Sequence, residues 1–333
     1  MQIIVIFIDS FQYIREMLES IFDKSIRVCF TNMWSAALIP EEMKYFLKPV
    51  VASCPQFKIV RQYKPHIQIF SVYRNNKKIK TSNARIKIFY TPENVNRPEY
   101  FLYKNNCIDS VNLSMGYDYL EADNYLRFPL WLLWFFSSAN SKDDIKIILN
   151  NSTEQREKTK FCSLIASHDT SGLRTNIYND ISKIAKVNCP GKLLHNDDTL
   201  YNYDSLSDDH KGNKFKYLQP FKFNICPENS ISKGYVTEKL FECLLSGCIP
   251  VYNGWSKNPE PDIINPNIIL WYDQFDEQNN KYTLNEVRKL HEDDKYYNSF
   301  IEQPFFCDTA VDKIYDVLSQ FNEKIRNILF EKN

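Results

Sequence analysis

The segment Phe221–Gly254, FKFNICPENSISKGYVTEKLFECLLSGCIPVYNG, contains the pattern that decides the fold. Apolar and polar residues alternate over its first six positions, which predicts a strand, and Pro227 ends it because proline has no N–H to donate. After Thr237 the apolar residues have helical spacing, and Gly247 is a typical helix stop. A short apolar strand, Cys248–Tyr252, follows. This order of strand, loop, helix and strand predicts a βαβ unit of an α/β fold.

The loop and helix start of this unit are suited to an anionic ligand. Ligands of open α/β sheets lie at the carboxyl ends of the strands. Glu238 and Lys239 fall in the first helical turn, where free N–H groups and the helix dipole attract anions, and the Thr237 hydroxyl is expected to cap the helix. Lys239 adds a full charge of the kind that stabilises a departing phosphate. A Thr-Glu-Lys start is also ordinary helix capping, so these three residues alone favour the cap.

Composition excludes several other function classes. Lys plus Arg equals Asp plus Glu at 41 each, so no net field favours nucleic acid. The 7 glycines form neither GxGxxG nor a P-loop, which weakens the dinucleotide and P-loop interpretations. The nine cysteines include no CxxC pair, so buried free thiols are expected rather than a zinc cluster or a disulfide framework. The acidic pair Asp197-Asp198, with His195 nearby, lies in a polar run and indicates a metal only weakly.

No apolar run is long enough for a transmembrane helix. The start, MQIIVIFIDSF, lacks the basic region of a signal peptide. The sequence therefore predicts a protein that is cytoplasmic or peripheral to a membrane.

The rest of the chain divides into two halves. Residues 125–136 are almost continuously apolar and are expected to be buried, whereas residues 137–160 read as a polar linker with one short helix. The C-terminal residues 308–330 carry one apolar stripe at helical spacing, which suits packing within one chain or between two. Further strands are expected at Ile26–Phe30, Ile67–Val72, Ile86–Tyr90 and Phe161–Ala166.

The whole string ENSxxxGYxTEK resembles the donor-binding signature of glycosyltransferase family 10, the α1,3/4-fucosyltransferases. The later stretch Gly247–Gly254 resembles the small-residue, Ile-Pro, Gly ending of that signature. A match of this length is far more specific than the Thr-Glu-Lys start alone. The matching residues are Glu228, Asn229, Ser230, Gly234, Tyr235, Thr237, Glu238 and Lys239.

Three earlier segments fit the same family in the same order. Phe89–Asn94, FYTPEN, resembles the YTGEN loop of the family, with Pro92 in place of glycine. Gly116–Leu130 resembles the segment that follows this loop. Phe161–Asp180 resembles the strand, loop and helix that present a phosphate-binding arginine.

The resemblance covers residues 26–272 and implies the α/β class named GT-B, in which two Rossmann-like domains face a central cleft. An acceptor-binding domain is expected at residues 1–150, with residues 1–25 as an extension, and a GDP-fucose-binding domain at residues 158–333. The C-terminal amphipathic helix would complete the fold. Animal members carry a membrane anchor and a stem, so this chain looks closer to the short bacterial type.

The family match implies that Glu93 is the base that removes the proton of the acceptor hydroxyl. Without the resemblance, a solvated loop acid near Asn94 and Arg97 is the better interpretation. Pro92 would stiffen the loop at the position of the family glycine, which makes this assignment the weakest one.

The match further implies that Arg174 and Lys239 neutralise the departing GDP, since Arg offers a planar fork and Lys a point charge. Glu238 would hold the ribose hydroxyls, and Asn229 and Tyr235 would lie near the base and the diphosphate. Asn229 as a loop cap and Tyr235 as a packing aromatic are the alternatives. Because two cations can replace a metal, no metal site and no required cofactor are expected, although a divalent cation could stimulate the reaction.

Together these features predict an inverting fucosyltransferase that transfers L-fucose from GDP-β-L-fucose to a hydroxyl of a glycan, with α1,3 linkage to GlcNAc expected. The partners of the protein would be GDP-fucose and an oligosaccharide or glycoconjugate. Two alternatives remain open: a GT-B transferase using another sugar nucleotide, and a catalytically silent glycan-binding relative.

Overall fold

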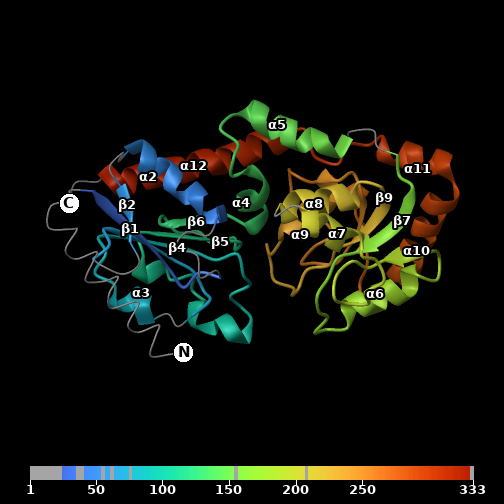
Figure 1. Cartoon of the computed structure of the whole chain (residues 1–333), viewed down its shortest axis with the longest axis horizontal. Coiled ribbons are helices and arrows are strands. Elements are labelled where there is room, and N and C mark those ends of the chain that lie inside the picture. Colours follow the sequence, from blue (N-terminus) through green and yellow to red (C-terminus); the bar gives the residue numbers. More distant parts are fainter. Residues whose placement is uncertain are drawn as a thin grey trace. The chain divides into compact units, whose positions relative to one another are not determined.

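The computed structural model describes residues 25–34, 41–53, 57–60, 64–74, 77–153, 157–206 and 209–330. The chain forms two compact units (Figure 1): the first contains residues up to Ser138 together with those from Asp316 onward, and the second contains Ala139–Tyr315. The expected domains, 1–150 and 158–333, differ from these units at the segment after Ser138 and at the C-terminal residues. Residues 1–24 of the expected extension lie outside the described part of the chain.

The first unit is built on a parallel sheet of six strands in the order β2-β1-β3-β4-β5-β6. All three strands expected in this half are present. The strands are β1 (Ile26–Thr31), β2 (Phe57–Ile59), β3 (Ile67–Phe70), β4 (Ile86–Tyr90), β5 (Leu113–Gly116) and β6 (Tyr125–Arg127). The chain leaves β1 toward β2 and then returns to β3 on the other side of β1. The neighbouring strands β1 and β3 therefore form a topological switch point, where ligands of such sheets bind.

Short helices connect and cover this sheet. In Figure 1, α3 lies on one side of it, and α2 with the end of α12 lies on the other. The elements are η1 (Glu41–Leu47), α2 (Lys48–Ser53), α3 (Lys77–Thr81), η2 (Pro98–Tyr103), η3 (Ile108–Ser110) and α4 (Leu130–Phe136). The expectation that residues 125–136 are buried is confirmed, with Trp131, Leu133 and Phe136 in the core.

The last helix, α12 (Ala310–Phe330), begins in the second unit and contributes its final residues to the first. Its apolar stripe faces a core, as predicted, because Ile314, Leu318, Phe321 and Ile325 are buried. The Phe321 ring lies 5.0 Å from the ring of Tyr45 and 5.6 Å from that of Phe128. This helix therefore closes the aromatic core of the first unit.

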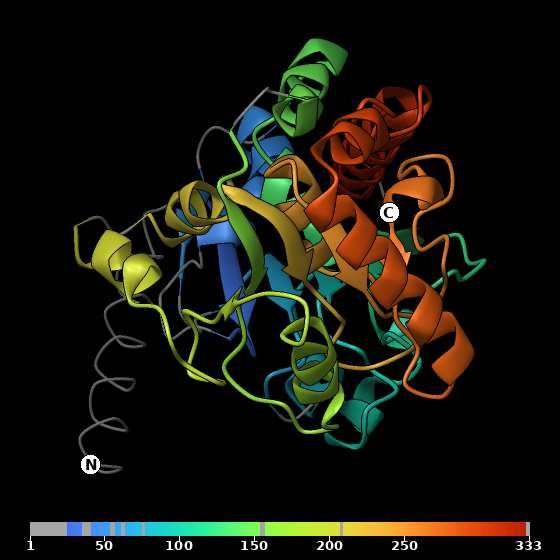
Figure 2. The same cartoon turned by 90° about the vertical axis from the view of Figure 1, so that its right-hand side faces the viewer.

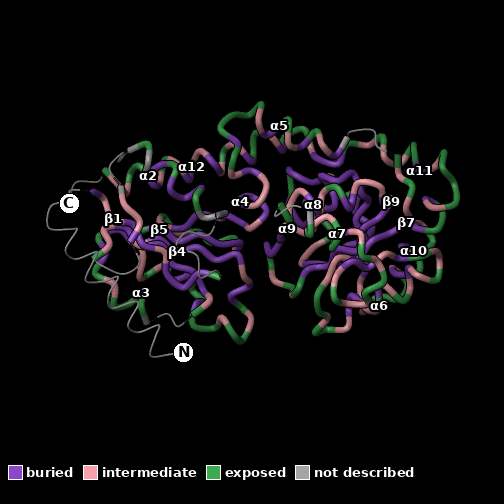
Figure 3. Tube along the Cα trace, viewed as in Figure 1, coloured by how far each residue is buried: buried purple, intermediate pink, exposed green. Residues whose placement is uncertain are grey.

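The second unit has a parallel sheet of five strands in the order β11-β10-β9-β7-β8. Its strands are β7 (Lys160–Leu164), β8 (Val187–Asn188), β9 (Phe221–Ile225), β10 (Ile249–Tyr252) and β11 (Leu270–Trp271). The switch point here lies between β7 and β9. The predicted βαβ unit is confirmed, because α9 (Glu238–Leu245) connects the parallel neighbours β9 and β10. Figure 3 shows β4, β5 and β9 as mostly buried.

Helices pack on both faces of this second sheet (Figure 2): α6 and α10 contact each other, as do α8 and α9. The predicted helix in the polar linker is α5, which begins with a capping box at Ser141. The elements are α5 (Lys142–Asn150), η4 (Asn151–Thr153), α6 (Leu173–Ile181), α7 (Thr199–Leu206), α8 (His210–Leu218), η5 (Pro266–Ile268), α10 (Glu277–Glu292) and α11 (Asp294–Ile301).

Gly247 ends α9 as predicted, with a φ of +68° that an L side chain rarely adopts. The Gly247 N–H donates to the Leu244 carbonyl at 2.9 Å, and the Cys248 N–H donates to the Cys243 carbonyl at 3.0 Å. These two bonds form a Schellman motif. Within the described residues, no helix combines the length and the apolar character that crossing a bilayer requires.

Candidate functional site

The loop after β9 turns back on the start of α9 through a buried carboxylate. Glu228 has a fully buried side chain, and its Oε1 accepts a hydrogen bond from the Thr237 N–H at 2.8 Å. Its Oε2 accepts a second bond from the Thr237 hydroxyl at 2.7 Å. The loop between these residues is therefore closed at its base, and Gly234 within it has a φ of +82°.

Thr237 occupies the N-cap of α9, but its hydroxyl does not cap the helix. The prediction of a hydroxyl cap is wrong because the Thr237 hydroxyl donates to Glu228 instead. The same hydroxyl oxygen accepts a hydrogen bond from Lys239 Nζ at 3.1 Å. The threonine side chain consequently does not occupy the first N–H groups of the helix. An anion that binds at a helix start needs such N–H groups as donors.

Lys239 lies between two carboxylates. Its Nζ is 3.5 Å from Glu238 Oε1 and 3.8 Å from Glu228 Oε2, and its side chain is 22% exposed. Burial lowers the pKa of Lys239, but the two carboxylates outweigh burial and hold this pKa above its ordinary value. Lys239 is therefore a fixed positive charge with access to solvent.

The pKa values of the two carboxylates in this cluster are shifted in opposite directions. Burial raises the pKa of Glu228 above its ordinary value, because Lys239 offsets only part of the cost of burying the charge. Burial also opposes ionisation of Glu238, but Lys239 and Lys214 outweigh it and hold the pKa of Glu238 low. Glu238 is thus an ionised carboxylate in the first turn of α9, available as a hydrogen-bond acceptor.

Arg174 reaches the same place from the other strand of the switch point. It lies on α6, which follows β7, and only 7% of it is exposed. One guanidinium nitrogen donates to the His168 carbonyl and another donates to Asn229 Oδ1. Burial lowers its pKa, while Asp169 and Glu228 act in the opposite direction. Two protein contacts thus fix the orientation of the fork.

Tyr235 completes the predicted donor set and is 2% exposed. Its N–H donates to the Ser232 carbonyl at 2.9 Å, and its phenol is close enough to Arg174 to affect the charge of the guanidinium. The structure therefore gathers all five predicted donor residues, Arg174, Asn229, Tyr235, Glu238 and Lys239, at the carboxyl ends of β7 and β9. Two cations held near each other among carboxylates can bind the oxygens of a diphosphate.

Two residues without a predicted role belong to this cluster. Glu228 was matched in the signature string, and its burial at the base of the loop is a signal that only the fold provides. Asp169 accepts a hydrogen bond from the Thr175 N–H at 2.8 Å, which ties the loop after β7 to the start of α6. The negative charges of both acids act to raise the pKa of Arg174.

Glu93 lies in the first unit, in the loop after β4, and is half-buried. Its Oε1 accepts a hydrogen bond from the Tyr73 phenol at 2.9 Å. The Glu93 N–H donates to the Thr91 hydroxyl at 3.1 Å, and the Asn94 side chain accepts from the Tyr117 phenol at 2.7 Å. Arg97 pairs with Glu99. The loop is thus held by Thr91 within it and by Tyr73 and Tyr117 outside it, and Glu93 is more enclosed than a solvated loop acid.

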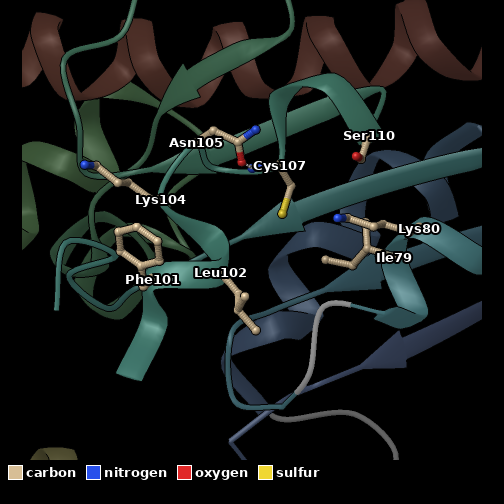
Figure 4. A pocket seen from close by; sticks show the side chains of 8 residues that line it. All are labelled: Ile79, Lys80, Phe101, Leu102, Lys104, Asn105, Cys107 and Ser110. Atoms are coloured by element: carbon tan, nitrogen blue, oxygen red, sulfur yellow. Dashed lines mark hydrogen bonds between the residues drawn. The ribbon is translucent and has the colours of Figure 1, made fainter. Parts of the chain in front are cut away.

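A separate cavity of about 510 Å³ lies elsewhere in the first unit, beside α3 and η2 (Figure 4). None of the predicted site residues lines it. Its walls are Ile79, Lys80, Phe101, Leu102, Lys104, Asn105, Cys107 and Ser110.

No group of three or more His, Cys, Asp or Glu side chains is arranged to hold a metal ion in the part of the chain that the structure describes. The weak metal candidate has other contacts: His195 pairs with Asp198 at 3.0 Å, and Asp197 accepts bonds from Thr199, Asn188 and Tyr217.

Two family models match the chain. Residues 154–307 match "Glycosyltransferase family 10 (fucosyltransferase) C-term", and residues 28–134 match "Alpha-(1,3)-fucosyltransferase FucT N-terminal domain". These matches contain all six predicted site residues, five in the first range and Glu93 in the second.

Curated relatives show the same similarity. The chain is 25% identical over 316 residues to the alpha-(1,3)-fucosyltransferase FucT of Helicobacter pylori, covering 84% of this chain and 60% of that protein. It is 29% identical over 186 residues to alpha-(1,3)-fucosyltransferase B of Drosophila melanogaster, covering 53% and 40%. The chain therefore spans less than two thirds of the length of these relatives.

Solved structures confirm the fold. The chain aligns with a crystal structure of an alpha1,3-fucosyltransferase with a TM-score of 0.58 and 21% identity, covering 91% of this chain and 92% of that one. A crystal structure of an alpha1,3-fucosyltransferase with GDP-fucose aligns with a TM-score of 0.54 and 22% identity, covering 90% of each. The predicted GT-B class, with two Rossmann-like α/β units, is thereby confirmed.

Proposed function

Because this chain belongs to glycosyltransferase family 10, the fucosyltransferases, we propose that it transfers L-fucose from GDP-β-L-fucose to a hydroxyl of a glycan acceptor. The proposed product has an α linkage, with α1,3 attachment to a GlcNAc unit as the expected case. The α1,3 assignment follows the relatives named above and the match of residues 28–134.

The observation that carries the proposal is the convergence of Arg174 and Lys239 at the start of α9. Both cations are held by protein contacts before any ligand binds, so little reorganisation is needed when charge develops on the departing diphosphate. Arg174 would contact two phosphate oxygens through its fork, and Lys239 would add a point charge. Glu238, ionised in the same turn, would accept hydrogen bonds from the ribose hydroxyls.

The proposed chemistry is one displacement with inversion. The acceptor oxygen attacks C1 of fucose, and the bond from C1 to the β-phosphate oxygen breaks, leaving its electron pair on GDP. The proton of the acceptor hydroxyl passes to the carboxylate of Glu93, which acts as the general base. Asn229 and Tyr235 would position the nucleotide, Asn229 through its contact with Arg174. The scheme uses no metal ion.

The test supplies the purified protein with GDP-fucose and a panel of N-acetyllactosamine acceptors, and measures GDP release with and without EDTA. We expect release that depends on the acceptor and persists in EDTA, with a product whose linkage is read by NMR. Release from another sugar nucleotide but not from GDP-fucose would reject the donor. Glycan binding without turnover of any donor would favour a silent relative.

Lys239→Ala tests the role of the cation. We expect it to lose most of the turnover, on the order of 100-fold, because removing one preformed stabiliser of transition-state charge has a cost of that size. Lys289→Ala is the matched control, since Lys289 is an exposed lysine of the same unit on α10. Near-normal activity of Lys239→Ala would reject the role.

A further inference from the structure

Three aromatic rings lie in contact at the carboxyl edge of the first sheet, and the central one, Tyr73, bonds to Glu93. Trp34 lies in the segment that follows β1, Tyr73 in the segment after β3, and Tyr100 in η2, which follows the β4 loop that carries Glu93. Strands β1, β3 and β4 are neighbours, and the switch point lies between β1 and β3. This edge is where an open α/β sheet binds its ligand.

Tyr73 is the central ring of the three. Its ring centroid is 5.8 Å from that of Trp34 and 6.2 Å from that of Tyr100, with interplanar angles of 70° and 78°. The Tyr73 N–H donates to the Asn32 carbonyl at 3.1 Å, which ties the segments after β1 and β3 together. Trp34 is 37% exposed, and Tyr73 and Tyr100 are half-buried. The rings therefore form a fixed surface that solvent can reach in part.

The Tyr73 phenol acts as a hydrogen-bond donor to the acid. Burial raises the pKa of Tyr73 above its ordinary value, and the nearby Glu93 carboxylate raises it further, so the phenol keeps its proton. The 2.9 Å bond uses Glu93 Oε1, and within the described residues the second carboxylate oxygen remains available to another donor. A fixed base with an available oxygen is what proton abstraction from a hydroxyl requires.

The chemistry around Glu93 and the three rings favours a neutral sugar over a nucleotide as the ligand. Aromatic faces pack against the C–H faces of a pyranose ring, while the carboxylate accepts a hydrogen bond from a sugar hydroxyl. A phosphate would be repelled by Glu93, and Arg97, a cation near Tyr100, is paired with Glu99. An uncharged saccharide with an exposed hydroxyl fits both features.

We propose that Trp34, Tyr73 and Tyr100 form the subsite for the acceptor sugar, and that Tyr73 is a positioning residue that orients the Glu93 carboxylate. The inference rests on the proposed function and adds to it the residues of the acceptor side. Trp34 and Tyr100 stack on the saccharide that presents the hydroxyl. Tyr73 acts on the reaction through Glu93.

Trp34→Ala and Tyr100→Ala test the stacking surface. We expect the acceptor KM to rise about tenfold, equivalent to 1.4 kcal/mol, with the KM for GDP-fucose unchanged. Phe101→Ala is the matched control, because Phe101 is the next residue of the same helix and lines the separate cavity (Figure 4). An unchanged acceptor KM in both variants, or an equal rise in the KM for GDP-fucose, would overturn the subsite.

Tyr73→Phe tests the positioning role while keeping the ring. We expect kcat to fall about tenfold with the acceptor KM nearly unchanged. The split between a lower kcat and an unchanged KM separates positioning of the carboxylate from a loss of acceptor binding. A kcat equal to that of the wild type would reject the role.

Acceptor binding is measured separately by saturation-transfer NMR with N-acetyllactosamine, so a failure of the subsite is distinct from a failure of the proposed function. Binding to the wild type that is lost in Trp34→Ala supports the subsite even without turnover. Full turnover with equal acceptor binding in wild type and Trp34→Ala overturns the subsite and leaves the fucosyltransferase proposal standing.

Discussion

The Glu228 carboxylate accepts two hydrogen bonds from Thr237, one from the backbone N–H at 2.8 Å and one from the hydroxyl at 2.7 Å. Thr237 is the ninth residue after Glu228, so these two bonds close the loop that carries Asn229 and Tyr235. The acid is fully buried and 3.8 Å from Lys239. This cluster is therefore built around a buried acid rather than around the helix cap that the sequence suggested.

Glu228→Gln should lower the free energy of unfolding by about 1–3 kcal/mol, because an amide cannot accept both bonds and leaves a buried group unpaired. Urea denaturation followed by circular dichroism measures this change. Tyr252→Phe is the control, since its phenol lies 3.4 Å from the same carboxylate and its loss should matter less. A Glu228→Gln protein as stable as the wild type would contradict the structural role.

Arg174→Lys should weaken GDP binding by at least about tenfold, since hydrogen bonds to charged groups contribute about 1.5–3 kcal/mol each and lysine cannot keep two contacts in one plane. Isothermal titration calorimetry with GDP measures the affinity. Arg288→Lys, on the exposed side of α10, should leave it unchanged. Equal affinity of Arg174→Lys and wild type would remove Arg174 from the diphosphate site.

Gly247→Ala should destabilise the second unit more than Gly172→Ala. Both glycines have positive φ, +68° and +76°, so both variants carry backbone strain of about 1–2 kcal/mol. A Cβ at Gly247 would also lie 3.2 Å from the Ser152 carbonyl oxygen, whereas one at Gly172 meets nothing within 4 Å. Thermal unfolding of the two variants compares them. Equal Tm values would show that the close approach has no effect on stability.

Asp197 should contribute a pH-dependent part of the stability. Partial burial opposes ionisation, but hydrogen bonds from Thr199, Asn188 and Tyr217 outweigh it and hold the pKa of Asp197 well below its ordinary value of 3.8. A lowered pKa in the folded state gives stability that is present above the unfolded pKa and lost as pH falls below it. Urea titrations from pH 5 to pH 2.5 should show this loss in the wild type. In Asp197→Asn the slope with pH should be smaller, and identical slopes would reject the assignment.

Much of the fold could be predicted from local sequence patterns. The strand Phe221–Ile225, the stop at Gly247 and the buried segment before Ser137 all depend on periodicity or on backbone preferences that neighbouring residues determine. The order of the strands could not be predicted from such patterns. The switch points between β1 and β3 and between β7 and β9 arise from long-range pairing.

In the candidate site, too, contacts between residues far apart in the sequence could not be predicted from local patterns. Arg174 and Asn229 are 55 residues apart, and only the family resemblance placed them in one site before the structure showed their contact. The partnership of Tyr73 with Glu93 had no sequence signal, since the two residues follow different strands. The hydroxyl of Thr237 was misassigned because capping rules consider only the helix itself, and a buried acid elsewhere in the chain took the bond.

The arrangement of α12 has a consequence for how the chain is made. Phe321 and Ile325 complete the core of the first unit, yet about 180 residues of other sequence are synthesised after Ser138 and before them. The second unit is contiguous and can fold as soon as its last strand and helices leave the ribosome. The unit that is synthesised first therefore cannot complete its core until α12 has been synthesised.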